Sequence, residues 1–241
     1  MQDTTPRGGI QAIARAGRVL RALEAAPEGL TLAALSAAVD LPKSTVHRLV
    51  AALTEEELVT TAPDGAIRLG GGLVRLGAAT RRALRHDLRP VLAQLRDEVD
   101  ETVDLSVLDG PSVRFVDQLP AEHRLRAVSA VGVAFPLHTT ANGKALLAAL
   151  PDDAVAALVP RDAALAAELD EIRRTGIAFD REEHTEGISA VGTAVHDAAG
   201  PVAAISIPVP TARFARNEAR YVAALRVAGA TASARLGGAA G

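Results

Sequence analysis

Five polar residues lie within six positions of one another in the N-terminal part of the chain, and together they could bind nucleic acid. Each offers a hydrogen-bond donor or a positive charge: Lys43, Ser44, Thr45, His47 and Arg48. Between them, apolar residues recur at the spacing of one helical stripe: Val46, Leu49, Val50 and Leu53. Donors opposite that stripe, at the helix N-terminus, suit phosphates and base edges. An ordinary solvated helix face remains the alternative when this helix is considered alone.

The neighbouring segments predict the domain that would position this helix. A helical pattern starts at Ile10 and stops before Pro27, with apolar residues at Ile13, Ala16, Leu20 and Leu23. Thr31 can cap a short second helix, and Pro42 suits the first turn of the third. Extended runs at 58–62 and 66–69 flank an Asp-Gly turn and indicate a hairpin. This order predicts a winged helix-turn-helix domain over residues 10–70, after a disordered tail of residues 1–9.

A glycine hinge at 70–72 precedes a mostly helical segment, residues 73–99, which Pro90 is expected to interrupt. We interpret residues 71–88 as a linker helix. Its apolar stripe could pack against a second copy of the chain or against the chain's own wing: Leu73, Leu76, Thr80 and Leu84.

The remainder of the chain, residues 89–241, mixes strands and helices without a regular βαβ repeat. The strand-like runs are 103–108, 113–119, 125–133, 177–180, 188–196 and 202–208. The helical runs are 141–150, 163–175 and 213–236, with a short one after Pro151. This pattern predicts an α+β domain with an antiparallel sheet that folds by itself.

Composition narrows the function classes. The 241 residues contain no cysteine, which excludes disulfides, thiolate metal ligands and a cysteine nucleophile. The polar N-terminus lacks a secretory pattern, and no apolar run is long enough for a membrane helix, so we expect a cytoplasmic protein without membrane contact. Residues 1–88 carry 11 basic and 9 acidic side chains, whereas residues 89–241 carry 15 and 20. The sign of this asymmetry fits phosphate contact by the first part.

The sequence motifs give little support for a catalytic site or a metal site. The candidate metal ligands match no dense ligand motif: His138, His184, His196, Asp180 and Glu183. The run from Asn142 to Ala145 resembles half a P-loop but lacks the hydroxyl residue after Lys144 and the upstream glycine. We therefore expect no metal, no cofactor and no enzymatic activity.

Two segments in the N-terminal part of the chain resemble a known family. The string LPKSTVHRLVAAL is similar to the recognition helix of IclR-type regulators (the isocitrate lyase regulator family), and AIRLGGGLVRLG resembles the wing and the segment after it. The resemblance implies that Lys43, Ser44, Thr45, His47 and Arg48 face DNA, and that Arg68 lies near the backbone or minor groove. It also implies dimerisation through the N-terminal region and often a further pairing into tetramers.

The string GIAFDREEHTEGISAVGTAVHD resembles the effector-domain signature of the same family, and PLHTTANGKALLAAL resembles the segment upstream of it. The implied fold is a GAF-like α+β domain with a pocket on one face of its sheet. By similarity the pocket uses five residues: Ala141, Asn142, Asp180, Ala190 and Ser206. The resemblance implies a small organic acid as the effector, and a helix N-terminus beside a serine hydroxyl can hold a carboxylate. Some relatives have Cys at Ala190 and Ser at Pro208, so a relative's ligand does not transfer directly.

The expected function is ligand-responsive regulation of transcription by a homodimer or tetramer on double-stranded operator DNA. The alternative is a small-molecule-binding or catalytic α+β protein whose helical N-terminus only oligomerises. An oligomerising helix would carry apolar residues in place of Lys43, Thr45 and Arg48, which favours the first interpretation.

Overall fold

The computed structural model describes residues 7–238, which form two compact units that divide between Arg82 and Ala83. The N-terminal elements are α1 (Arg7–Glu24), α2 (Leu32–Val39), α3 (Lys43–Glu55), β1 (Val59–Thr61) and β2 (Ile67–Leu69). Helix α4 (Gly71–Val99) follows. The C-terminal elements are β3 (Val103–Asp109), β4 (Ser112–Leu119), β5 (Ala134–Pro136), α5 (Ala141–Ala148), α6 (Asp152–Leu158), α7 (Ala163–Thr175), β6 (Ala178–Arg181), β7 (Ile188–Asp197), β8 (Gly200–Pro210) and α8 (Thr211–Arg235).

The N-terminal unit is the predicted three helices followed by a two-stranded hairpin. Thr31 caps α2, because its side chain accepts a hydrogen bond from the Ala34 amide at 3.2 Å. The three helices and the hairpin share one apolar core: Val19, Leu23, Leu35, Val39, Val46, Val50, Leu53, Val59 and Ile67. Two expectations for α1 need correction. The helix begins at Arg7, inside the segment expected to be a disordered tail, and Ile13 is 75% exposed while Val19 takes the core position. Residues 1–6 of that tail lie outside the described residues.

The glycines at 70 and 72 have a packing role in place of the expected hinge. A Cβ at Gly70 would lie 2.2 Å from the Glu57 carbonyl oxygen, and one at Gly72 would lie 2.7 Å from the same atom. The Gly72 amide also donates to that carbonyl at 3.0 Å. Glycine is therefore required where α4 starts, because the backbone passes directly against the end of α3.

Helix α4 is continuous, so the expected interruption at Pro90 is wrong. Pro90 lies inside the helix at an exposed position. A proline at that position leaves the carbonyl of His86 without its helical donor. Because the site faces solvent, water can satisfy that carbonyl and the helix continues.

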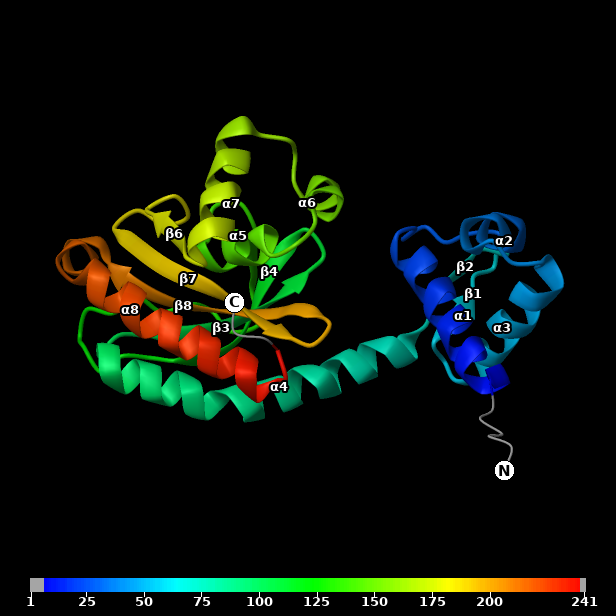
Figure 1. The fold of residues 1–241 in the computed structure, drawn as a ribbon, viewed down its shortest axis with the longest axis horizontal. Coiled ribbons are helices and arrows are strands. Elements are labelled where there is room, and N and C mark those ends of the chain that lie inside the picture. Colours follow the sequence, from blue (N-terminus) through cyan, green and yellow to red (C-terminus); the bar gives the residue numbers. More distant parts are fainter. Residues whose placement is uncertain (1–6, 239–241) are drawn as a thin grey trace, which may run out of the picture. The chain divides into compact units, whose positions relative to one another are not determined.

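The C-terminal unit is built on a six-stranded antiparallel sheet with the strand order β5-β4-β3-β8-β7-β6 (Figure 1). Helix α8 and the C-terminal half of α4 cover one face, where Leu88, Leu92 and Leu95 pack on the sheet. Helices α5 and α7 cover the other face through Leu147, Ile172 and their neighbours. Both faces are therefore buried, and the strands position side chains alternately toward α8 and toward α5. No helix within residues 7–238 combines the length and apolarity needed to cross a bilayer.

Residues 125–133 are not the strand that their apolar alternation predicted. They form a loop whose leucine and valine side chains are exposed, with Leu125 at 70% and Val128 at 63%, while Ala127 is buried. The loop is held by its own contacts with the sheet, because Thr102 Oγ1 donates to the Ala127 carbonyl at 2.7 Å and Ser129 Oγ donates to Asp104 Oδ2 at 2.5 Å. Only the next three residues pair with β4, as strand β5.

The contacts of α4 suggest where the C-terminal unit should be cut for separate expression. Leu88 is fully buried in its core, and the exposed Arg85 and Arg89 both approach the buried Asp117, at 3.7 Å and 2.6 Å. A fragment that begins at residue 89, the predicted boundary, lacks Leu88 and Arg85. We expect residues 83–241 to melt cooperatively, and residues 89–241 to be less stable by about 2–5 kcal/mol, the cost of removing a buried leucine.

Differential scanning calorimetry of the two fragments checks this prediction. A fragment of residues 83–241 that is insoluble or melts without a cooperative transition would contradict the independence of this unit. Equal melting temperatures for the two fragments would contradict the role of Leu88.

Candidate DNA-binding helix and effector site

The polar side of α3 is open to solvent over its first two turns. Lys43, Ser44, His47 and Arg48 are exposed, and Thr45 is half-buried. Within the described part of the chain, no carboxylate lies within 4.0 Å of the cationic groups on this face. The helix begins after Pro42 without a side-chain cap. Amide groups of its first turn and the positive end of the helix dipole therefore accompany the basic side chains, which suits binding to phosphates.

Arg68 lies on β2 of the hairpin and is tied to its own unit. Its Nε donates to the Glu28 carbonyl at 3.0 Å, and its guanidinium lies 3.6 Å from the Asp64 carboxylate. These contacts attach the wing to the loop between α1 and α2. Contact between Arg68 and DNA stays a prediction, and it would require this half-exposed group to share or exchange these partners.

On the α5 side of the C-terminal sheet, four of the five predicted effector-site residues come together. Strand pairing aligns Ala190 with Asp180 on one side, and aligns Gly192 with Ser206. Helix α5 packs directly on this region, because a Cβ at Gly192 would lie 2.9 Å from the backbone of Ala141. Ala141, Asn142, Ala190 and Ser206 are all buried there. Their contact with a ligand stays a prediction.

Asp180, the fifth predicted residue, lies beside Ala190 but its carboxylate is already engaged. Oδ1 accepts hydrogen bonds from the Glu183 amide at 2.9 Å and from the His184 amide at 3.4 Å. Burial raises the pKa of Asp180, and these amide donors oppose that shift. The observed contacts are those of a cap for the turn at 182–184, and contact between Asp180 and a ligand stays a prediction.

Several polar residues of this region were missed by the sequence reasoning. Asp104 and Ser106 of β3 lie on the same face as Ser206, since Asp104 pairs directly with Ser206 in the sheet register. Asn142 Nδ2 donates to Ser106 Oγ at 2.6 Å. The signal was present in the alternation of residues 103–107, which places Asp104 and Ser106 on one side of a strand. Without knowledge of the pairing, that side could equally have faced solvent.

Asp104 is the strongest electrostatic feature of this cluster. The residue is fully buried, and its carboxylate accepts hydrogen bonds from Gln118 Nε2 at 2.7 Å and from Ser129 Oγ. Burial raises the pKa of Asp104 to about 6, against the lowering effect of those two donors. Near neutral pH the cluster therefore holds a carboxyl group that can take up a proton at modest cost.

Lys144 anchors the opposite side of α5. Its side chain is fully buried, and Nζ donates to Glu168 at 2.6 Å and to Glu183 at 2.8 Å. The residue that resembled part of a P-loop therefore joins α5 to α7 and to the loop after β6. Near Asp104, in contrast, Asn142 Oδ1 is a buried oxygen for which no donor is found among the described residues. An acceptor left open in this way is available to a ligand.

Within residues 7–238, no three histidine or acidic side chains converge as metal ligands. The polar groups of the site are Asn142 Oδ1 as an open acceptor, the hydroxyls of Ser106 and Ser206, and the carboxyl group of Asp104. Such a set can orient a small polar molecule against the apolar side chains around it.

Comparison with known proteins agrees with both parts of this arrangement. Residues 12–63 match the IclR helix-turn-helix domain, and residues 76–234 match the bacterial transcriptional regulator IclR C-terminal domain. The chain is 45% identical over 237 residues to the HTH-type transcriptional regulator Rv1719 of Mycobacterium tuberculosis, covering 93% of this chain and 92% of the relative.

Solved structures show the same fold. An IclR-family regulator from a Rhodococcus species is 30% identical, with a TM-score of 0.61 over 97% of this chain and 96% of that one. An IclR homologue from Microbacterium hydrocarbonoxydans, crystallised in complex with 4-hydroxybenzoate, is 22% identical, with a TM-score of 0.60 over 93% of this chain and 98% of that one. With a helix-turn-helix unit at its N-terminus and the matching effector domain after it, the chain belongs to the IclR family of bacterial transcriptional regulators.

Proposed function

We propose that this regulator binds a two-fold symmetric operator as a homodimer through α3, and that a small organic acid in the α5-side cluster controls the binding. The observation that carries the DNA-binding part is the exposed polar face of α3, whose cationic groups have no carboxylate partner in the described residues. Lys43, Ser44, Thr45, His47 and Arg48 are assigned to DNA, with Arg68 at the adjacent backbone or minor groove.

The effector part is supported by the position of the buried polar cluster. Asn142 offers an open acceptor, and Ser106 and Ser206 supply hydroxyls beside the start of α5. Asp104 lies opposite Ser206 in the sheet register, so an organic acid would bind here with Asp104 protonated, because two carboxylates in one buried site repel each other. The complex of the Microbacterium homologue with 4-hydroxybenzoate is consistent with a small acid as ligand.

A regulator of this kind acts in the cytoplasm and needs no catalytic step, so we assign the chain no enzymatic activity. The test of the whole proposal is fluorescence anisotropy with operator fragments from the promoters adjacent to its own gene, over a series of salt concentrations. Specific binding should weaken steeply as salt rises, because phosphate contacts release counterions. A thermal-shift screen of carboxylic metabolites should then find an acid that raises the melting temperature and changes the operator affinity. Absence of salt-dependent binding to any such fragment would overturn the DNA-binding role.

The oligomeric state gives a separate prediction. One recognition helix reads only a few base pairs, so specificity requires two copies about 34 Å apart or at a multiple of that spacing. Val74 and Leu76 of α4 are 69% and 56% exposed in the single chain, which leaves apolar surface for a second copy. We expect a homodimer, with two dimers pairing into a tetramer. Light scattering at micromolar concentration measures this, and a mass near the 24.8 kDa of one chain, with and without operator DNA, would contradict it.

A further inference from the structure

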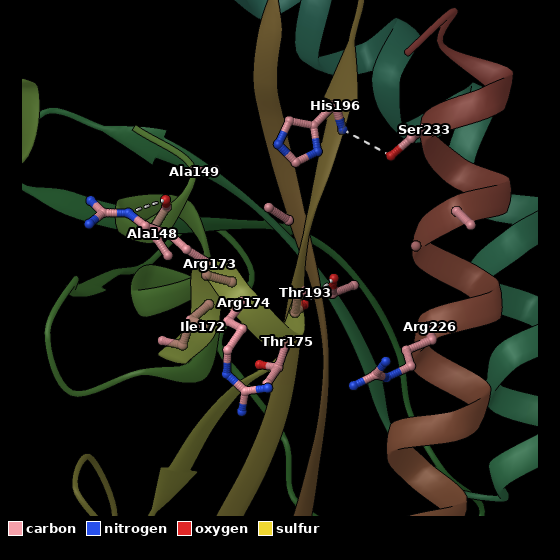
Figure 2. Close-up of a pocket in the computed structure, with 15 residues that line it drawn as sticks. Ala148, Ala149, Ile172, Arg173, Arg174, Thr175, Thr193, His196, Arg226 and Ser233 are labelled. Atoms are coloured by element: carbon pink, nitrogen blue, oxygen red, sulfur yellow. Dashed lines mark hydrogen bonds between the residues drawn. The ribbon is translucent and has the colours of Figure 1, made fainter. Parts of the chain in front are cut away.

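A hollow lies away from the effector cluster, at the end of β7 that has no partner in β6. Strand β6 pairs with β7 only as far as Gly192, so residues 193–196 of β7 have no neighbouring strand on that side. A groove of about 520 Å³ lies here, between α5 and α7 on one side and α8 on the other (Figure 2). None of the five predicted effector residues lines it.

The floor and walls of the groove are made largely of small side chains. Ala145, Ala148 and Ala149 come from the α5 segment, Ala194 from β7, and Ala230 from α8. These residues leave room without exposing large apolar groups. A small molecule with a short hydrocarbon part could therefore lie against them.

The charged residues of the groove all have the same sign. Its lining contains the three arginines Arg173, Arg174 and Arg226, one histidine, His196, and no acidic residue. This is unexpected in residues 89–241, which carry 15 basic against 20 acidic side chains. Walls of one charge around a partly enclosed space concentrate ligands of the opposite charge.

The three arginines differ in how far they are already paired. Arg173 is fully engaged, since it donates to the Ala148 carbonyl and to both Asp152 and Asp170. Among the described residues Arg174 pairs with Glu171 alone, and both side chains are mostly exposed. For Arg226 no carboxylate lies within 4.0 Å among the described residues, and Figure 2 shows its side chain reaching from α8 toward the groove.

We propose that this groove is a binding site for a small oxyanion, a carboxylate or a phosphate ester, distinct from the effector cluster. Arg226 approaches it from α8 and Arg174 from α7, on the two sides of the unpaired end of β7, and His196 of β7 lies at the end of the groove nearest Ser233. A ligand here would contact both α7 and α8, which lie on opposite faces of the sheet. It would therefore stabilise the C-terminal unit as a whole.

Titration calorimetry of the full-length protein with citrate and, separately, with inorganic phosphate tests the proposal at constant ionic strength. Citrate binding with no phosphate binding identifies a carboxylate site, and the reverse identifies a phosphate site. Arg226→Gln should lower the affinity for the anion that binds by about tenfold, which corresponds to the loss of one charge-assisted hydrogen bond. Arg216→Gln, on the same helix and exposed but outside the groove, should leave the affinity unchanged. Ala230→Glu, which adds bulk and negative charge at an exposed groove position, should abolish binding.

The basic face of α3 could also attract these anions, so the location is measured as well. Hydrogen exchange should show protection at residues 172–176 and 226–233 when ligand is added, and Arg48→Ala should retain the binding. If neither probe binds, if protection is confined to α3 or to the effector cluster, or if the affinity survives both Arg226→Gln and Ala230→Glu in variants that melt like the parent, the proposal is wrong.

Discussion

Arg48→Ala is expected to weaken operator binding by about 1–3 kcal/mol, or roughly five- to 150-fold, if the side chain contacts a base edge. The residue is exposed on the polar face of α3, one turn after the N-terminus of the helix, and no carboxylate in the described residues neutralises it. Fluorescence anisotropy with the operator and with a variant sequence measures the loss. A loss confined to the operator indicates contact with a base. A uniform loss, with a salt slope smaller by about one, indicates contact with a phosphate.

The variant should remain folded, because Arg48 packs against no part of the core and its removal leaves the helix intact. Arg216→Ala provides the matched control, since it removes an exposed arginine from α8 in the other unit. If folded Arg48→Ala protein binds operator like the parent, α3 is not the recognition helix.

The second large effect concerns Asp104 and pH. The pKa of this carboxyl is raised from 3.8 to about 6 by burial, so the folded state binds a proton more readily than the unfolded state between these two values. Stability must therefore fall as pH rises through that window, by about 3 kcal/mol from this group alone. Asp104→Asn removes the ionisation while it keeps the shape of the side chain. Its stability relative to the parent should thus improve from pH 4 toward pH 7 by about that amount.

Chemical denaturation of parent and variant across this range measures the difference, and Asp87→Asn, at an exposed position on α4, is the control. The control should show no comparable trend, because an exposed carboxyl keeps its contact with water when the protein folds. A difference between Asp104→Asn and parent that does not change between pH 4 and pH 7 would contradict the raised pKa. The same variant also bears on the effector, since an organic acid bound beside the neutral amide of the substituted side chain would no longer require proton uptake.

Local signals in the sequence determined most of the elements. Thr31 and Gly176 mark helix ends whose geometry depends only on neighbouring backbone: Thr31 accepts from the Ala34 amide, and Gly176 takes the left-handed conformation that ends α7. The Asp-Gly turn at 64–65 positions the wing hairpin in the same way. The polar face of α3 could also be predicted from the sequence, because helical periodicity alone separates Arg48 from the buried Val46 and Val50.

Other features depend on partners distant in the chain, and only the tertiary structure decided them. The alternation of residues 125–133 was typical of a strand, yet most of them form a loop that Thr102 and Asp104 hold by side-chain hydrogen bonds, and only Gly132 and Val133 reach the backbone of β4. Pro90 breaks helices in general, but its exposure allows α4 to continue. In both cases the local sequence favoured one structure, but packing and solvent access determined which structure formed.

The candidate sites, too, divide into features that the sequence determined and features that only the tertiary structure determined. The sequence by itself determined the family, the exposed polar face of α3 and the strand that carries Ser206. It could not show that Asp104, about one hundred residues away, pairs with Ser206, or that Lys144 is buried between Glu168 and Glu183. Nor could it show that arginines of α7 and α8 line one groove where β6 ends. Alternation predicts which side chains share a face of a strand, but it does not identify the strand that lies beside it, and charge and burial at a site depend on that neighbour.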